Sequence, residues 1–321
     1  MGRPRTAVAT IVLVAVVAGA GAVLAHATVP GKNGRIVFVG PSPNRLWVIN
    51  PDGTGLRKLT ITKGPRLSDK HPDWSPDGSK IAFERCEQIC RVWTINPDGT
   101  GLKRLGPAGD DRAMPAWAPN GKLIAFSRGW GPVENGWIKF NDIFVMNASG
   151  GASRQVTHVT TSSPFSAGAV NPMWAPDGKR LVFEVQNSPR GDPANRRALF
   201  VINADGSEQR QLTPWSLNGS DPDWSPDGRT ILFRSVPGRE QHGNLYTINA
   251  DGSDLNQLTR YPSPKAVFSG SFSPDGKWIT FARFWGTDPY PAIFVMRVDG
   301  AGVRQVSPQG YNVAPDWGPT R

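Results

Sequence analysis

The stretch Trp74-Ser75-Pro76-Asp77-Gly78, followed by Ile81-Ala82-Phe83, recurs along this chain and decides its fold. It joins a large aromatic residue to a tight turn and then to a short apolar strand. Pro and Gly suit such a turn because Pro restricts φ and Gly adopts positive φ without a steric penalty. Matching copies begin at further aromatic residues, and one more aromatic residue stands near the C-terminus: Trp117, Trp174, Trp224, Phe272 and Trp317.

A second repeated pattern lies between these copies. Short apolar strands such as Leu46-Trp47-Val48-Ile49-Asn50 mostly precede an Asp-Gly pair, of which Asp52-Gly53 is the first. Asp-Gly favours a tight hairpin because both residues tolerate positive φ. A further short strand, such as Lys58-Leu59-Thr60, follows each turn. No part of residues 28–321 shows a sustained 3.6-residue apolar period, so the repeats predict strands rather than helices.

Four short antiparallel strands in each of six repeats predict an all-β fold, a six-bladed β-propeller of four-stranded blades. The first repeat begins at Ile36 and lacks its aromatic strand, whereas Asn312 to Trp317 supplies such a strand at the other end. We therefore expect the C-terminal strand to join the N-terminal blade and close the ring, which would remove exposed sheet edges. The expected organisation is a single propeller domain over residues 28–321.

The repeats resemble the TolB-like six-bladed β-propeller family. The resemblance rests on the Trp-Ser-Pro-Asp-Gly-x-x-Ile-Ala-Phe element, as at Trp74 to Phe83, and on closing strands such as Arg57-Lys58-Leu59-Thr60. It covers about residues 33–320. It implies the fold but not one function, because related propellers serve as periplasmic scaffolds, as peptidase gating domains and, in rarer relatives, as polysaccharide lyases.

Residues 1–27 have the features of an export signal. Arg3 and Arg5 form a positive start, Ala7 to Leu24 is an uncharged apolar run, and Ala25-His26-Ala27 fits a cleavage site. The run is also at the lower limit of length for spanning a bilayer, so an uncleaved anchor is the alternative. We expect a periplasmic, cell-envelope or secreted monomer that meets a membrane only if this segment is retained.

In an oxidising compartment, the only two cysteines, Cys86 and Cys90, are expected to form a local disulfide. Their spacing excludes a redox C-x-x-C pair, and the shortage of partner ligands argues against a zinc site. We therefore expect no metal and no cofactor.

The chain of 321 residues has a basic excess, 36 Lys+Arg against 26 Asp+Glu, or a net charge of +10. Removal of residues 1–27, which include two Arg and no acidic residue, leaves +8. Several basic residues, such as Arg57 and Lys58, recur in the outermost strands, where charge blocks edge-to-edge association. The nearly balanced remainder is not the basic stripe that binds phosphate backbones, so no nucleic acid partner is expected.

Strand alternation places the variable connections on one face of the predicted ring, which we call the variable face, and the uniform Pro-Asp-Gly and Asp-Gly turns on the other. Variable loops on a rigid frame are where recognition usually occurs. We expect the variable face and the channel mouth to bind a protein or a cell-wall glycan. Aromatic rings there can stack on sugars or anchor a peptide, or can instead cover the blade rims. The candidate ligand-binding residues are His71, Asp111, Arg112, Trp130, Trp137, Trp285 and Tyr290.

The sequence favours a non-catalytic protein over an enzyme, and no catalytic residue is assigned. His71 stands three residues before a repeated aromatic residue, but one His with scattered Asp residues does not supply the three protein ligands of a catalytic metal. The alternative is a carbohydrate-active lyase or hydrolase acting in the central channel around His71, Asp111 and Arg112. The positions that match His71 in the other repeats hold Met114, Asn171, Asp221, Ser269 and Ala314.

Two repeated features lie next to the aromatic residues. Asp73, Asp223 and Asp316 directly precede an aromatic residue, and we expect them to bond to the backbone of a neighbouring blade, because buried polar groups generally find partners. Proline stands two residues before five of the six aromatic residues. Since Pro cannot donate to a strand ladder, it suits the free edge of the innermost strand.

Overall fold

The computed structural model describes residues 30–41, 44–61, 67–107, 111–134, 137–158, 166–188, 196–237, 243–262, 266–284 and 290–320. The predicted export signal, residues 1–27, lies outside these ranges, and so does Trp285. Within them, no helix is long and apolar enough to cross a membrane. In these ranges the secondary structure consists of strands apart from one short 3-10 turn, η1 (Trp215–Leu217), which confirms the all-β class.

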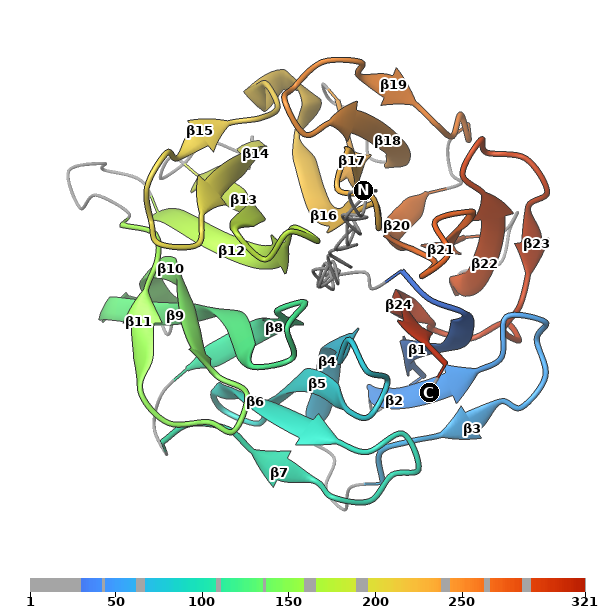
Figure 1. The fold of residues 1–321 in the computed structure, drawn as a ribbon, viewed down its shortest axis with the longest axis horizontal. Coiled ribbons are helices and arrows are strands. Elements are labelled where there is room, and N and C mark those ends of the chain that lie inside the picture. Colours follow the sequence, from blue (N-terminus) through green and yellow to red (C-terminus); the bar gives the residue numbers. More distant parts are fainter. Residues whose placement is uncertain are drawn as a thin grey trace, which may run out of the picture.

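The strands form five sheets around a central axis (Figure 1). Four sheets have four strands each, in the orders β24-β1-β2-β3, β4-β5-β6-β7, β16-β17-β18-β19 and β20-β21-β22-β23. The fifth has eight strands and contains β8 to β11 and β12 to β15, which meet through one parallel residue pair, Asn141 with Gly168. The strand bounds are β1 (Asn33–Gly40), β2 (Arg45–Ile49), β3 (Arg57–Lys58), β4 (Ser68–Trp74), β5 (Ile81–Cys86), β6 (Cys90–Ile95), β7 (Lys103–Arg104), β8 (Arg112–Trp117), β9 (Leu123–Glu134), β10 (Trp137–Asn147), β11 (Ser153–Gln155), β12 (Ser166–Trp174), β13 (Arg180–Ser188), β14 (Arg196–Asn203), β15 (Arg210–Gln211), β16 (Gly219–Trp224), β17 (Thr230–Ser235), β18 (Asn244–Asn249), β19 (Asn256–Gln257), β20 (Val267–Phe272), β21 (Trp278–Arg283), β22 (Ala292–Arg297), β23 (Arg304–Gln305) and β24 (Val313–Pro319).

The C-terminal strand lies in the same sheet as the N-terminal strand. β24 pairs with β1 in antiparallel register, with Trp317 opposite Ile36 and Asp316 opposite Val37. Trp317 Nε1 also donates a hydrogen bond of 3.2 Å to the carbonyl oxygen of Gly34. The strand pairing inferred from the incomplete first repeat is therefore present.

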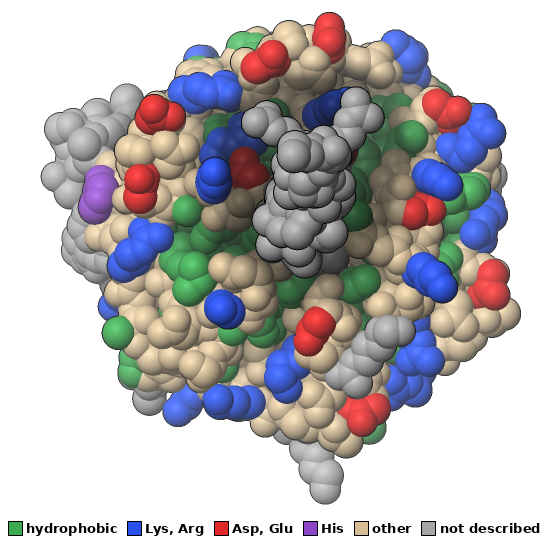
Figure 2. Space-filling model, in the orientation of Figure 1, with side chains coloured by type: hydrophobic (Ala, Val, Ile, Leu, Met, Phe, Trp, Pro, Cys, Tyr) green, Lys and Arg blue, Asp and Glu red, His purple; other side chains and the backbone are tan. Residues whose placement is uncertain are grey.

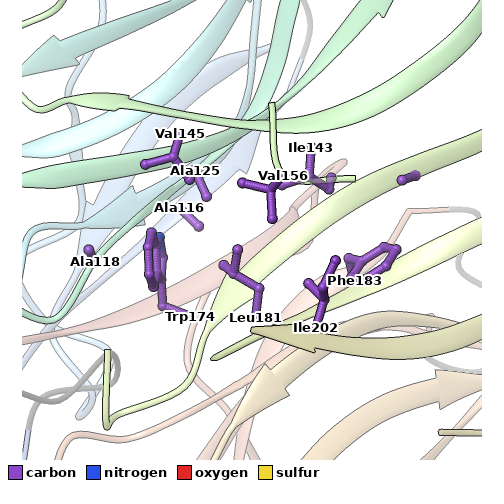
Figure 3. Packing of buried hydrophobic residues seen from close by; sticks show 11 residues of the cluster. Ala116, Ala118, Ala125, Ile143, Val145, Val156, Trp174, Leu181, Phe183 and Ile202 are labelled. Carbon is purple, nitrogen blue, oxygen red and sulfur yellow. The ribbon is translucent and has the colours of Figure 1, made fainter. Parts of the chain in front are cut away.

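The repeated Trp residues pack between neighbouring groups of strands. Trp174 and Phe183 lie in one buried cluster with Ala125, Ile143 and Val145 of the preceding group (Figure 3). Trp74 packs in the same way with residues of β1 and β2. Each Trp therefore belongs to two groups of strands at once, and the core consists of the contacts between them.

The basic residues of the outermost strands bond to the next turn around the rim. The Arg57 guanidinium donates to the carbonyl oxygens of Asp98, at 3.0 Å, and of Pro97. These charges therefore tie consecutive groups of strands together, besides the edge protection expected from the sequence. On the face seen in Figure 2, Lys and Arg lie scattered among Asp and Glu rather than in a stripe. As with Arg57, hydrogen bonds from a basic side chain to a backbone carbonyl oxygen of the next turn join Lys103 to Ser149, Arg154 to Ala204 and Arg210 to Ala250.

Candidate functional site

The inner strands β4, β8, β12, β16, β20 and β24 surround a cavity of about 240 Å³ on the central axis. Phe268 and the half-exposed Tyr311 also line it. The same position in each inner strand contributes one side chain to the wall, and together we call these residues the mouth ring: His71, Met114, Asn171, Asp221, Ser269 and Ala314.

A local irregularity in the inner strands accompanies the mouth ring. Five of its members have φ between 45° and 54°, and each of the five stands before a proline. The pairing register shifts at the same place, for example between Lys70 and Asp73 in β4. Positive φ in a residue other than Gly costs on the order of 1 kcal/mol or more. Bulges of this kind commonly re-aim a side chain next to a functional site, so the repeated strain marks the cavity as a candidate site.

Side chains of the preceding strands hold the mouth ring in place. Glu84 Oε2 accepts the N–H of Met114 at 3.0 Å, and Ser127 Oγ accepts the N–H of Asn171 at 3.2 Å. Both acceptors directly follow the repeated Phe of a middle strand. At Met114 and Asn171 the backbone is therefore held by a neighbouring group of strands, while both side chains line the cavity.

An ion pair lies on one side of the cavity. His71 Nδ1 is 3.1 Å from Glu84 Oε2, and the Glu84 side chain is almost fully buried. Burial acts to lower the pKa of His71, but the carboxylate of Glu84 more than offsets this, so the pKa of His71 lies above its usual value. Burial acts to raise the pKa of Glu84, but His71 and the Met114 N–H bring it below its usual value. The two groups therefore stabilise each other's charged forms.

The tip of the β5–β6 hairpin lies next to this ion pair. Cys86 and Cys90 form a disulfide there, which confirms the predicted pairing. Asp111 Oδ1 accepts the N–H of Cys90 at 2.9 Å. Burial, with a contribution from the nearby Glu84 carboxylate, raises the pKa of Asp111. The structure therefore brings Asp111 close to the ion pair of His71 by way of this hairpin.

A second polar cluster includes two other members of the mouth ring. Asn171 Nδ2 donates a hydrogen bond of 3.1 Å to Asp221 Oδ1. Beside it, Arg197 Nε is 3.5 Å from Glu184 Oε1. Burial raises the pKa of Glu184 to about 7; Arg197 acts against this rise, and Asp221 adds to it.

Three carboxylates line the inner part of the cavity, next to the repeated aromatic residues. Burial raises the pKa of Asp223 to about 8 and that of Asp316 to about 6. The neighbouring Asp316 also raises the pKa of Asp223. Each carboxylate accepts the N–H of an aromatic residue in another group of strands, as predicted: Asp73 from Trp117 at 2.6 Å, Asp223 from Phe272 at 2.7 Å and Asp316 from Trp74 at 2.7 Å.

Among the candidate binding residues chosen from the sequence, His71 lines the cavity, but Arg112 does not. Arg112 is only 3% exposed. Its guanidinium lies 4.8 Å from the Phe126 ring centroid and donates to Met146 Sδ at 3.1 Å. These two contacts lie within the sheet, and a ligand-binding role of Arg112 stays a prediction. Tyr290 is 54% exposed and lies outside the cavity lining.

From the sequence, the segment from Gly129 to Trp137 reads as a long aromatic insertion and is expected to be a loop of the variable face, but it is mostly strand. β9 continues to Glu134 and β10 begins at Trp137, so this expectation was wrong. The two segments pair on both sides of a register shift between Ile138 and Phe140, with Trp137 opposite Glu134 and Trp130 opposite Phe140. Pairing satisfies backbone donors and acceptors that a loop would leave to water. The backbones of Trp130 and Trp137 therefore lie on adjacent strands of one hairpin; their side chains lie outside the described part of the structure, as does the whole of Trp285.

Glu84 is the site residue that sequence reasoning missed. The sequence did contain a signal for it. The residue that follows the repeated Phe is small or apolar in most of the other repeats, but it is Glu84 in one repeat and Glu184 in another. A charged residue at an otherwise buried repeat position indicates a specific partner. For Glu84 that partner is His71, and for Glu184 it is Arg197.

Comparisons with known proteins agree with this architecture. The family model for the TolB beta propeller domain matches residues 142–319. TolB from Acinetobacter baumannii is similar over 89% of this chain and 67% of its own, with a TM-score of 0.69 and 21% identity. A chain of the nidogen–laminin complex matches 88% of this chain and 97% of its own, with a TM-score of 0.64 and 12% identity. Oligogalacturonate lyase in complex with manganese matches 86% of this chain and 74% of its own, with a TM-score of 0.52 and 14% identity. No curated protein sequence matches this chain.

Proposed function

Since the chain belongs to the TolB β-propeller domain family, we propose that it is a non-catalytic binding scaffold whose channel mouth receives an extended segment of another protein. The observation that carries this proposal is the mouth ring. Five of its positions have strained backbone, yet they hold side chains of different chemistry. Positive φ at a residue other than Gly is strained, and Gly would relieve it. Strain that is retained at positions lining a cavity therefore favours a functional role for their side chains.

The proposal treats the chain as a six-bladed propeller closed by β24. The eight-stranded sheet is counted as two blades, β8 to β11 and β12 to β15. Each half repeats the strand order of the other sheets, and the halves meet through a single residue pair, which supports this count. Pairing of β24 with β1 supports closure. A closed ring is a rigid support, which lowers the entropy cost of binding at its centre.

The chemistry of the cavity favours a basic segment over a neutral one. Asp221 is in the mouth ring, and the carboxylates of Asp73, Asp223 and Asp316 lie further in. A cavity of about 240 Å³ is small, so it suits the end of a chain or a single side chain. A cationic group in this cavity would donate charge-assisted hydrogen bonds to these carboxyl groups and would favour their ionised forms, which burial otherwise disfavours. Tyr311 and Phe268 would pack against the apolar part of the same segment.

Binding of short peptides tests the proposal. We expect basic hexapeptides to bind the full chain and acidic ones not to bind, measured by calorimetric titration. Asp221→Asn should weaken the basic peptide about tenfold, since it removes one charge-assisted contact. Tyr311→Ala should also weaken it, whereas Leu255→Ala, which removes an equally exposed side chain (46% each), should not. Equal binding by all variants would refute the mouth as the binding site.

Cell-wall oligosaccharides in the same titration separate the two ligand classes. The protein could bind a glycan more tightly than every peptide and lose this binding when Trp130→Ala and Trp137→Ala are combined. That result would indicate a sugar ligand at the β9–β10 hairpin instead. Tyr290 and Trp285 are the further aromatic residues to replace in that case. Unsaturated products from acidic polysaccharides, abolished by His71→Ala, would instead establish the lyase alternative.

We also propose that the protein is exported, to the periplasm, the cell envelope or the medium. The support is the signal-like composition of residues 1–27 together with the disulfide between Cys86 and Cys90, which persists in oxidising compartments. N-terminal sequencing of the native protein tests this: a start at Thr28 is expected, and an intact Met1 in a cytoplasmic fraction would contradict it.

A further inference from the structure

The tip of the β5–β6 hairpin gathers two sulfur atoms and a carboxylate. Cys86 ends β5 and Cys90 begins β6, directly opposite each other. Glu84 stands two residues before Cys86, and residues two apart in a strand share a face. Cys86 Sγ is 3.5 Å from Glu84 Oε1. The donor atoms of Glu84, Cys86 and Cys90 lie within 4.8 Å of one another, the only such group of three in the described part of the chain.

We propose that reduction of this disulfide creates a binding site for Zn²⁺ or a similar thiophilic cation, formed by both thiolates and Glu84 Oε1. Zinc is bound tetrahedrally, with Zn–S near 2.3 Å and Zn–O near 2.0–2.2 Å, which places a ligating sulfur and oxygen about 3.5 Å apart. Cys86 Sγ and Glu84 Oε1 already have this separation. Two thiolates give the site its selectivity for soft metals.

The surroundings orient the carboxylate for this role. Glu84 Oε2 accepts the N–H of Met114 at 3.0 Å and lies 3.1 Å from His71 Nδ1. One oxygen is therefore anchored, and the other points to the cysteines. Metal-ligating carboxylates are usually fixed by such outer hydrogen bonds, and losing them costs about 10–100-fold in affinity.

Three protein ligands leave the fourth coordination position open, as in zinc sites that exchange water or a ligand. Asp111, which accepts the N–H of Cys90, lies beside the hairpin tip. The open position would thus be available to water or to a ligand beside the hairpin tip.

The oxidised and metal-bound forms exclude each other, because sulfurs that share a bond are not thiolates. A dithiol reductant supplies two electrons and two protons to the Cys86–Cys90 bond, giving two thiols and its own disulfide. Zn²⁺ then displaces both thiol protons as the two Zn–S bonds form. Zn²⁺ binding would therefore report the redox state of the compartment.

Cobalt titration of the full chain tests the site. Protein reduced with dithiothreitol, freed of it without oxygen and titrated with Co²⁺ should bind one ion with sulfur-to-cobalt charge-transfer absorption, which Zn²⁺ then displaces. The oxidised protein should show no such absorption. Glu84→Gln should weaken Co²⁺ binding to the reduced protein at least tenfold. Glu87→Gln, which alters an exposed glutamate of the same turn, should not change it.

Two outcomes would overturn the proposal. One is reduced protein without thiolate–cobalt absorption, and the other is unchanged affinity in Glu84→Gln, which would indicate a plain dithiol chelate. If Glu84→Gln fails to fold, X-ray absorption of the zinc-loaded, reduced wild-type chain decides instead. Two sulfur neighbours with oxygen in the remaining positions are expected, whereas four sulfurs, from two chains sharing one ion, would refute the site.

Discussion

Stability should fall as pH rises from about 5 to about 8, because the cavity buries carboxyl groups with raised pKa values. Asp223 is almost fully buried, and its pKa is about 8, against an ordinary value of 3.8. In this pH range the folded chain keeps the Asp223 proton and the unfolded chain has lost it. Since the folded state binds more protons, the free energy of unfolding decreases with pH. The stabilisation from Asp223 is therefore fully present below about pH 4 and lost by about pH 8.

The size of the effect follows from proton linkage. One proton bound only by the folded state changes the free energy of unfolding by about 1.4 kcal/mol per pH unit. Asp223 alone therefore removes about 3 kcal/mol between pH 5 and pH 7. For a chain of this size that is a fall of roughly 4–5 °C in Tm. Asp316, with a pKa of about 6, and Glu184, with a pKa of about 7, act in the same direction.

Asp223→Asn isolates this contribution. The amide oxygen still accepts the N–H of Phe272, but the group no longer ionises. We expect the variant to have a higher Tm than the wild type at pH 8 and a shallower pH dependence, measured by scanning calorimetry from pH 5 to pH 8. Asp227→Asn, at an exposed position in the following turn, should leave the pH dependence unchanged. A wild-type Tm that is constant or rises over this range would refute the reasoning, as would an unaltered slope in Asp223→Asn.

Three further predictions concern the fold. Trp174→Ala should cost about 3–5 kcal/mol in denaturant unfolding, because the ring fills the core between two groups of strands, and Trp174→Phe should cost less. Deletion of residues 310–321 removes β24 and should give aggregated protein in size-exclusion chromatography, and a soluble product with unchanged Tm would contradict the role of β24. Arg57→Ala should lower the free energy of unfolding by about 1 kcal/mol, because its hydrogen bonds to the next turn are lost, whereas Arg57→Lys should recover part of it.

The repeated residues predicted the fold because their roles are local or nearly so. Gly78 and Gly53 have positive φ, as the turn chemistry requires. The aspartates before the aromatic residues, such as Asp223, could be assigned correctly because the same geometry recurs around the ring. The hairpin β9–β10 could not be predicted, since Gly131 and Pro132 suggest a loop and only the pairing of Trp130 with Phe140 reveals a strand.

The sequence signals that Glu84 has a partner, but it cannot identify His71 as that partner, for a different reason. Glu84 and His71 come from adjacent strands, and which residues meet across them depends on the bulge between Lys70 and Asp73. The sequence does not reveal this register shift. It therefore allows the pairing of β4 with β5 to be inferred only near Trp74, which lies opposite Ile81. Likewise, nothing in the pattern around Arg112 distinguishes a side chain that faces the cavity from one that lies over Phe126.

The mouth ring differs between repeats because the frame does not depend on its side chains. Glu84 and Ser127 bond to the backbone N–H groups of Met114 and Asn171, and a backbone donor is present whatever the side chain. A substitution in the mouth ring therefore changes the cavity without removing the hydrogen bonds that hold it. The acceptors have no such freedom, because replacing Glu84 leaves a buried N–H without a partner. If the mouth ring binds a ligand as proposed, its specificity can therefore change there while Glu84 and Ser127 stay the same.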